Sequence, residues 1–503
     1  MNKPTENTVA VQSRSINKLL GLILGPLCFV LILAFVDLEG LSQQGHAVMA
    51  STVWIAIWWI SEAIPIAVTS LLPIVLFPLT GALELSETTA SFGHKYIFLY
   101  IGGFMLAIAI ERWGLHRRIA LSIIKLIGTS MKMIVLGFMI ATAFLSMWIS
   151  NTATSVMMIP IGLAIISQLK DNPDTEADEN ELFGKMLMLA IAYSASIGGL
   201  STLIGTPPNL VLAGILTELY DVEISFAKWI MFGLPVSVVL LAICWWYLTN
   251  RSFRLKIKSF PGGRPEIERQ LASLGPISRE ERRVLIVFIL TAVAWISRSF
   301  LLQPLIPGID DTIIAVCAGV SLFLIPAPAK KGRALITWNE AVKLPWGILL
   351  LFGGGLALAE GFQSSGLAVF IGEQMAGLKG IALLALLLIL VAAVNFLTEI
   401  TSNLATTAMM LPILAPLALS IGVHPFLLMV GTTVAASCAF MLPVATPPNA
   451  VVFGSGYLKI FDMVRVGIWM NLISILLLTA IVYWVLPLLW GFDPLVFPAG
   501  WIK

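Results

Sequence analysis

The chain has 503 residues, of which 58% are hydrophobic and 12% charged, with a formal net charge of +2 and a mean hydropathy of +0.95. Soluble domains carry about 25% charged residues, so this composition excludes a soluble protein and predicts an all-α polytopic membrane protein. A helix needs roughly 20 apolar residues to span a bilayer. Six apolar runs form cores of such helices: 19–36, 64–83, 134–148, 230–248, 381–396 and 472–489.

The first apolar run follows a polar N-terminal segment without an Ala-x-Ala cleavage site, which predicts a retained first helix. Loops rich in Lys and Arg tend to stay in the cytoplasm. The N-terminal tail carries Lys3, Arg14 and Lys18, and segment 251–283 carries nine basic residues, so both are predicted to be cytoplasmic. Segment 37–46 has none and is placed outside. The simplest count is about eleven spans plus two polar-tipped segments, in the inner (plasma) membrane, with the C-terminus outside.

A polar-then-apolar phrase occurs twice, as SNTATSVMMIP at 150–160 and SNLATTAMMLP at 402–412, which are 252 residues apart. The same offset pairs Gly114 with Gly366. A second phrase, GTPPN at 205–209, returns as ATPPN at 445–449 with an offset of 240 residues. A longer connection at 169–185 accounts for the difference. The sequence therefore predicts two copies of one unit.

Each copy is predicted to contain five spans, and because five is odd, the copies should run in opposite directions across the membrane. Inverted repeats with broken helices are typical of secondary transporters, whose binding site lies between the repeats. The predicted divisions are 1–47 (tail and first span), 48–250 (first repeat, with a hairpin tip at 150–152 and a broken helix at 205–209), 251–283 (cytoplasmic linker) and 284–503 (second repeat, with a hairpin tip at 402–404 and a broken helix at 445–449).

The repeated phrases have the chemistry of a binding site. A Pro-Pro pair removes two backbone donors and disfavours helix before it, so both Pro-Pro-Asn phrases should break a helix in mid-span and free carbonyls for Na⁺. The Ser-Asn phrases supply neutral donors and acceptors at the hairpin tips. No cationic side chain lies beside them, so the charge of an anionic substrate would have to be balanced by bound Na⁺.

Each feature taken alone is also compatible with a purely structural role. Ser, Thr and Asn in membrane helices often only bond a neighbouring helix, and Pro-Pro can be a simple kink. Four phrases in symmetric pairs favour a site. Glu399 is an intramembrane acid and hence a functional candidate, although a structural role bonding backbone N–H groups within the hairpin is equally open. The cysteines and histidines have no metal-ligand spacing, and no nucleophile–base constellation indicates an enzyme.

With these phrases, the chain resembles the divalent anion:sodium symporter family of dicarboxylate, citrate and sulfate transporters. The resemblance rests on SMWISNTATSVMMIP, SASIGGLSTLIGTPPN, LLLFGGGLAL, TEITSNLATTAMMLP and AASCAFMLPVATPPNAVVF, and it extends over roughly residues 20–490. It implies a homodimer in membrane lipid, with a scaffold and a transport domain in each protomer. It also implies eleven spans, two re-entrant hairpins and an elevator-like movement of the transport domain.

The resemblance also implies site residues. The coupling ion Na⁺ would be held at one site by Ser146, Ser150, Asn151 and Gly205, and at a second by Thr398, Thr401, Asn403 and Ala445. The substrate would be held by Asn151, Thr152, Ser402, Asn403 and Leu404, with Thr206, Thr446 and Pro447 as further contributors.

Leu404 departs from the Ser-Asn-Thr pattern that is usual in dicarboxylate carriers, which leaves the substrate open more than the mechanism. The resulting prediction is a Na⁺-coupled importer of divalent organic anions, with C4-dicarboxylates such as succinate first and citrate second. The alternatives are a Na⁺-independent anion exchanger, a sodium:sulfate symporter, and a channel or non-transporting scaffold. No nucleic-acid partner is expected.

Overall fold

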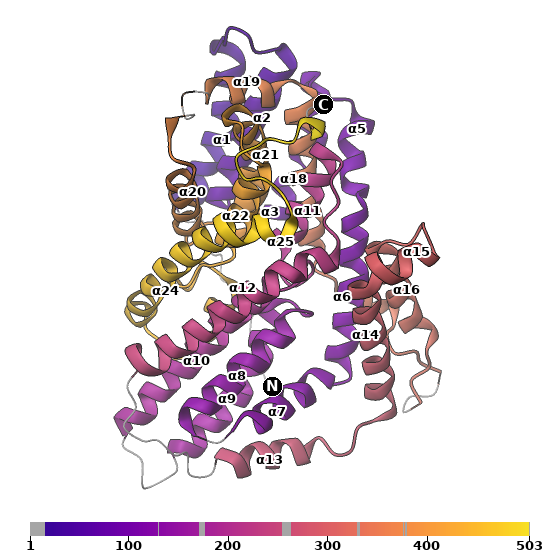
Figure 1. The fold of residues 1–503 in the computed structure, drawn as a ribbon, viewed down its shortest axis with the longest axis vertical. Helices are drawn as coiled ribbons and strands as arrows, with labels where there is room; N and C mark the ends of the chain where they lie inside the picture. Colours follow the sequence, from indigo (N-terminus) through magenta and orange to yellow (C-terminus); the bar gives the residue numbers. More distant parts are fainter. Residues whose placement is uncertain are drawn as a thin grey trace, which may run out of the picture.

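The computed structural model describes residues 16–128, 130–170, 177–253, 263–328, 332–375, 377 and 380–501. This part of the chain is built from helices, with one isolated β-bridge between Pro326 and Ala334. The predicted all-α fold is therefore confirmed (Figure 1). The first fifteen residues and segments 171–176 and 254–262 lie outside the described residues. The predictions for Lys3 and Arg14 therefore also lie outside them, as do parts of the predicted longer connection and linker.

The elements follow one another in two groups. The first group is α1 (Ile16–Phe35), α2 (Gln43–Ser61), α3 (Ile66–Thr69), α4 (Leu72–Thr80), α5 (Leu85–Ala90), η1 (Ser91–Gly93), α6 (Lys95–Arg112), α7 (Leu115–Ile127), α8 (Met131–Ser146), α9 (Asn151–Lys170), α10 (Ala177–Gly199), α11 (Pro207–Tyr220), α12 (Phe226–Tyr247) and the π-helical turn η2 (Leu248–Ser252).

The second group is α13 (Gly263–Ser273), α14 (Arg279–Ser297), the π-helical turn η3 (Arg298–Leu302), α15 (Gln303–Leu305), α16 (Asp311–Leu324), α17 (Trp338–Ala341), α18 (Trp346–Ser364), α19 (Leu367–Gln374), α20 (Leu383–Leu397), α21 (Asn403–Ile421), α22 (Pro425–Ala436), α23 (Pro447–Phe453), α24 (Ile460–Ala480), the π-helical turn η5 (Ile481–Val485), α25 (Leu486–Trp490) and η6 (Ala499–Trp501).

Among the described residues, eight helices are long and apolar enough to cross a membrane, and five shorter apolar helices accompany them. One predicted span differs from the structure. The apolar run at 64–83 is divided into α3 and α4 at Ser70 and Leu71. The Ser70 hydroxyl bonds the Ile66 carbonyl at 2.8 Å and accepts the Trp59 indole N–H at 3.2 Å, so this interruption is held by polar contacts inside the protein.

The two halves repeat the same order of elements at the offset found in the sequence. Helices α8 and α20 begin at Met131 and Leu383, and α9 and α21 begin at Asn151 and Asn403, each pair 252 residues apart. Helices α7 and α19 are equivalent by the same offset, and Figure 1 shows them at opposite ends of the molecule. Elements that are equivalent in sequence thus lie far apart in space.

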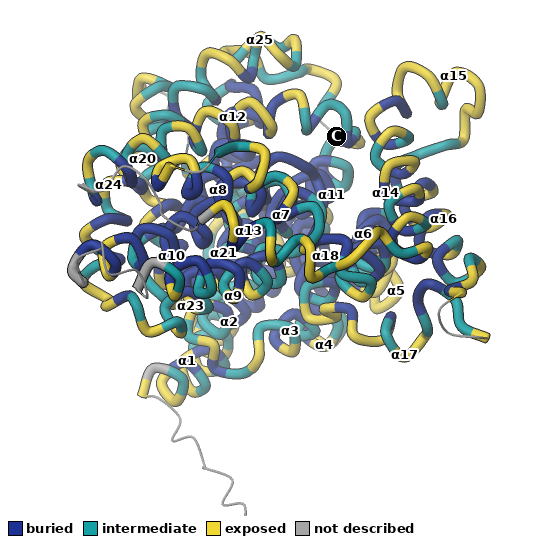
Figure 2. The backbone as a smooth tube through the Cα atoms, turned by 90° about the horizontal axis from the view of Figure 1, so that it is seen from below, coloured by how far each residue is buried: buried dark blue, intermediate teal, exposed yellow. Residues whose placement is uncertain are grey.

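Burial divides the helices into an interior and a periphery (Figure 2). In α10, 89% of the spanning window is buried, against 11% in α1. The exposed residues of α1 are mostly Leu, Ile, Val and Phe, which is the surface expected to face lipid. The buried helices α8, α9, α10, α11 and α22 carry or adjoin the repeated polar phrases, so the polar phrases lie in or next to the interior of the molecule.

Candidate functional site

The first hairpin tip is formed by α8 and α9, which four residues (147–150) connect. The Ser146 hydroxyl, at the end of α8, donates to the Ala195 carbonyl of α10 at 2.7 Å. Helix α10 approaches α8 closely because Gly198 packs on Ala143, whose carbonyl oxygen would lie 2.3 Å from an added Cβ. The tip is thereby fixed against the last turns of α10.

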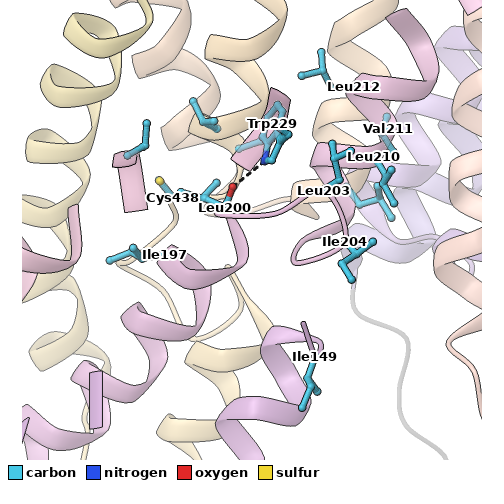
Figure 3. Packing of buried hydrophobic residues seen from close by; sticks show 14 of the residues in the cluster. Ile149, Ile197, Leu200, Leu203, Ile204, Leu210, Val211, Leu212, Trp229 and Cys438 are labelled. Carbon is cyan, nitrogen blue, oxygen red and sulfur yellow. Dashed lines mark hydrogen bonds between the residues drawn. The ribbon is translucent and has the colours of Figure 1, made fainter. Parts of the chain in front are cut away.

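The first interrupted helix consists of α10, the loop 200–206 (loop 1) and α11. Asn209 shapes loop 1, because its side-chain nitrogen donates to the carbonyls of Gly199, Leu200 and Thr202 at 3.2, 3.4 and 2.8 Å. The Trp229 indole N–H also donates to the Leu200 carbonyl at 2.9 Å (Figure 3). Helix α10 ends at Gly199 and α11 begins at Pro207, so the interruption precedes the Pro-Pro pair, and polar side chains bond three carbonyls at its start.

Asn151 joins the tip to loop 1 in a group of oxygen atoms that we call cluster 1. One terminal atom of its amide lies 2.6 Å from Ser146 Oγ and 3.2 Å from the carbonyl oxygens of Ala195 and Gly205. With the nitrogen at this position, the amide donates to these acceptors. With the oxygen there, it joins Ser146 Oγ and two carbonyl oxygens in a group of neutral oxygens that can bind a cation.

Cluster 2 is the equivalent group at the second hairpin tip. The Thr398 hydroxyl, after α20, lies 2.8 Å from Asn403 Oδ1 and 2.9 Å from the Ala436 carbonyl at the end of α22. One hydroxyl hydrogen serves one of these two acceptors, so the other contact is between two oxygens, which a bound cation would satisfy. Thr398 thus occupies the place that Ser146 occupies in cluster 1.

The second interrupted helix consists of α22, the loop 437–446 (loop 2) and α23. Asn449 repeats the role of Asn209, donating to the carbonyls of Ala439 and Leu442 at 3.3 and 3.0 Å. These acceptors are equivalent to Gly199 and Thr202 by the offset of 240 residues. Both Pro-Pro-Asn phrases therefore build the same local structure.

Three residues predicted to hold Na⁺ have hydrogen bonds to groups outside the clusters. The Ser150 hydroxyl takes the Ala153 N–H at 3.3 Å, at the start of α9. The Thr401 hydroxyl bonds the Leu397 carbonyl at 2.8 Å and Thr406 Oγ1 at 2.6 Å. The Ala445 N–H donates within loop 2, to the Leu442 carbonyl at 3.2 Å. The other residues proposed for Na⁺ are brought together in the two clusters: Ser146, Asn151, Gly205, Thr398 and Asn403.

The residues predicted to hold substrate lie at the hairpin tips and at the starts of α11 and α23. Thr152 and Ser402 are partly exposed at the tips. Leu404, by contrast, is only 6% exposed and belongs to the hydrophobic core. Thr206 and Thr446 are buried N-caps, and Pro447 is the exposed first residue of α23.

The sequence did not reveal the two backbone carbonyls of the clusters, those of Ala195 and Ala436. Every residue has a carbonyl, so nothing in the identity of these alanines marks them. Gly199 was also missed, although its Cα packs against the Asn151 amide closely enough that an added Cβ would lie 2.6 Å from Asn151 Oδ1. A signal was present here, since the pair Gly198-Gly199 stands directly before loop 1.

The four segments that build the clusters (146–151, 195–209, 398–403 and 436–449) contain one charged residue, Glu399. The helices α9 and α21 begin at the two tips, so the tips carry free backbone N–H groups and the positive ends of the helix dipoles. Chemically, the oxygens of each cluster suit a cation, and the helix N-termini at the tips suit an anion.

Comparison with known proteins gives relatives of the whole chain. The transmembrane-region model of the sodium:sulfate symporters matches residues 16–490. A protein of Staphylococcus saprophyticus named sodium-dependent dicarboxylate transporter SdcS is 50% identical over 487 residues, which cover 96% of this chain and 94% of the relative. The protein of the same name from Staphylococcus aureus strain USA300 is 50% identical over 484 residues, covering 95% and 93%.

Two solved structures share the fold at low sequence identity. The Alcanivorax borkumensis YdaH transporter aligns with a TM-score of 0.57 at 16% identity and covers 81% of this chain and 88% of its own. Neisseria gonorrhoeae MtrF aligns with a TM-score of 0.56 at 13% identity, covering 95% and 96%.

The helical fold, its candidate spans and these relatives identify a multi-pass membrane transporter rather than an enzyme. The chain belongs to the sodium:sulfate symporter family, which is the divalent anion:sodium symporter family that its sequence resembles.

Proposed function

We propose that this protein is a Na⁺-coupled symporter that imports divalent organic anions, C4-dicarboxylates such as succinate first and citrate second. The observation that carries the proposal is the pair of equivalent oxygen clusters, Ser146–Asn151 and Thr398–Asn403, each built from a hairpin tip and the carbonyl end of an interrupted helix. Two such clusters on either side of one anion site would bind cations and anion together.

Coupling follows from charge. The segments around the site supply no Lys or Arg, so a dicarboxylate would enter a region of neutral donors and helix N-termini. Placing the negative charges of the substrate in this region is costly without a counter-charge, since burying an unpaired charge is strongly unfavourable. Na⁺ at the clusters supplies that charge, so substrate binds well only after the cations.

The organic anion is favoured over sulfate by the relatives. The two relatives that are 50% identical carry the name of sodium-dependent dicarboxylate transporters, although the family model is named for sulfate. In this proposal Asn151, Thr152, Ser402 and Asn403 bind the carboxylates, with Thr206, Thr446 and Pro447 around them. The buried Leu404 side chain forms a wall of the site.

A Na⁺-independent exchanger is the second candidate, and one feature argues against it. Such a protein would need a fixed cation in place of Na⁺, whereas Ser146, Gly205, Thr398 and Ala445 are all neutral. We further propose the homodimer, the elevator-type movement, and the orientation with a cytoplasmic N-terminus and an outer C-terminus. The placement of α7 and α19 at opposite ends supports the inverted repeat on which that movement depends.

The experiment is uptake of labelled succinate, citrate and sulfate into proteoliposomes, with and without an inward Na⁺ gradient. We expect Na⁺-driven accumulation of succinate above citrate and little uptake of sulfate. Uptake that ignores Na⁺ but requires dicarboxylate inside the vesicles would replace symport by exchange. Sulfate accumulation without succinate uptake would instead make the protein a sulfate symporter.

A further inference from the structure

Glu399 is the one charge in the segments that build the site, and it is only 3% exposed. Its Oε1 accepts the backbone N–H groups of Phe440 and Met441 at 2.8 and 2.9 Å, and its Oε2 accepts that of Leu442 at 3.0 Å. The Asn471 amide of α24 donates to Oε1 at 2.7 Å. All four partners are donors, which is the hydrogen-bonding pattern of an ionised carboxylate.

The first repeat has no equivalent carboxylate. The residue 252 positions before Glu399 is Met147, and the residue 240 positions before Leu442 is Thr202. These two positions are also in contact, but there the Thr202 hydroxyl donates to the Met147 carbonyl at 2.5 Å. In the first repeat, a side chain of the loop bonds a backbone group of the hairpin. In the second repeat, a side chain of the hairpin bonds backbone groups of the loop.

The carboxylate has two physical consequences for cluster 2. Glu399 follows Thr398 in the chain and fixes loop 2, which begins directly after Ala436, so it sets the separation of two of the oxygens in the cluster. It also places a negative charge beside a cation site in a region of low dielectric, where charges interact far more strongly than in water. Cluster 1 has a tie of the first kind, from Thr202 to Met147, but no carboxylate.

We propose that Glu399 is a positioning residue for cluster 2, and that its carboxylate makes cluster 2 bind Na⁺ more tightly than cluster 1. This inference rests on the proposed function, because it takes both clusters as Na⁺ sites. It adds that the two sites, although built alike, are unequal and have a defined order of filling, with cluster 2 first.

The test uses the purified full-length protein with Glu399→Gln, and Glu360→Gln as the matched control, since Glu360 lies on α18 and is bonded by Ser364. Two readouts are measured: succinate uptake as a function of Na⁺, and the Na⁺-dependent rise in unfolding temperature without substrate. We expect Glu399→Gln to raise the Na⁺ midpoint about tenfold, as the loss of a charge-assisted hydrogen bond would do. The succinate KM at saturating Na⁺ should change much less, and Glu360→Gln should match the wild type.

Two further backgrounds separate the clusters. In a Ser146→Ala background, in which cluster 1 is weakened, Glu399→Gln should still reduce the Na⁺-dependent rise in unfolding temperature. In a Thr398→Ala background, in which cluster 2 is weakened, Glu399→Gln should not change this rise further. An equal shift in both backgrounds, or an unchanged Na⁺ midpoint in Glu399→Gln, would overturn the inference.

The outcomes for the two proposals are distinct. Wild-type uptake that ignores Na⁺ refutes the symport itself, whereas a Na⁺-dependent wild type with an unshifted Glu399→Gln refutes only the role of Glu399. If Glu399→Gln does not fold, Asn471→Ala decides, because it removes one donor and leaves the carboxylate. A smaller rise in the Na⁺ midpoint is then expected, and no rise counts against the inference.

Discussion

Thr398 and Asn403 are joined across the second hairpin tip at 2.8 Å, and Ser146 and Asn151 are joined in the same way across the first tip at 2.6 Å. Each pair spans five residues, and each hydroxyl also contacts a carbonyl at the end of the next helix, Ala436 or Ala195. Because the two tips have the same geometry, we expect their side chains to bind the same kind of ligand. Single substitutions can distinguish the residues of the clusters from neighbouring residues that do not belong to them.

Replacing either asparagine should stop transport. We expect Asn151→Ala and Asn403→Ala each to reduce Na⁺-driven succinate uptake by about a hundredfold, because each removes the amide that joins the tip to its cluster and a polar group proposed to bind the substrate, together worth about two tenfold steps. The Na⁺-induced rise in unfolding temperature should also diminish. The matched controls are Ser150→Ala and Thr401→Ala, whose hydroxyls bond Ala153 N and Thr406 Oγ1 instead. Controls as defective as the asparagine variants would show that the clusters extend to these residues.

Substrate choice should respond to residue 404. Leu404→Thr is expected to raise the ratio of succinate to citrate uptake by about two- to tenfold, since a gained hydrogen bond contributes about 0.5–1.5 kcal/mol. The reciprocal variant Thr152→Leu, at the equivalent position of the first hairpin, should weaken succinate uptake. Competition assays with both anions measure the ratio. An unchanged ratio in Leu404→Thr would show that this buried side chain does not face the substrate.

Loop 1 should not tolerate a side chain at Gly205. A Cβ there would lie 2.5 Å from the Gly199 carbonyl oxygen, a backbone atom that cannot move without distorting cluster 1. Gly205→Ala should therefore abolish uptake and lower the unfolding temperature. Gly103→Ala is the control, because the nearest atom to its added Cβ is 3.5 Å away on the flexible Ile204 side chain. Normal uptake by Gly205→Ala would mean that loop 1 adjusts as readily as loop 2, which carries Ala445 at this position.

Stability at low pH should depend on Glu340, in the connection between α16 and α18. Burial raises its pKa, but hydrogen bonds from the Arg333 guanidinium and from Thr337 outweigh burial and lower the pKa from 4.5 to about 2. A folded-state pKa below the unfolded one means that the ionised carboxylate stabilises the protein above pH 4.5, and that this contribution is lost as the pH falls toward 2.

Thermal unfolding of the purified protein between about pH 7 and pH 3 checks this prediction. Glu340→Gln should unfold at a lower temperature than the wild type at neutral pH, and the difference should shrink with acidification. A difference that is constant across the range would contradict the assigned role of the ion pairs with Arg112 and Arg333.

The positions of the hairpin tips and helix breaks could be predicted because they depend on residue types with strong local effects. Ser-Asn phrases and Pro-Pro pairs affect the backbone at their own positions in the chain. Their repetition at fixed offsets locates the second copy once the first is known. Helices α9, α11, α21 and α23 begin at Asn151, Pro207, Asn403 and Pro447, within these phrases.

The carbonyl ligands and the partners of Glu399 could not be predicted in the same way. Ala195 and Ala436 act through backbone atoms, and Glu399 meets Asn471 across 72 residues and Phe440 across 41, separations that only tertiary packing sets. Similarly, Ser150 and Thr401 were predicted with the cluster residues, yet the structure gives their hydroxyls local partners, Ala153 N for Ser150 and Thr406 Oγ1 for Thr401.

The exchanged roles at Met147–Thr202 and Glu399–Leu442 bear on which parts of the two halves can replace one another. The hairpin and the loop of each pair belong to the same half, so each pair is complete within its own half. A hairpin taken alone from the first half would present loop 2 with a methionine where its three backbone N–H groups need an acceptor. Hairpin and loop are therefore matched parts, which can be exchanged between the halves together but not one at a time.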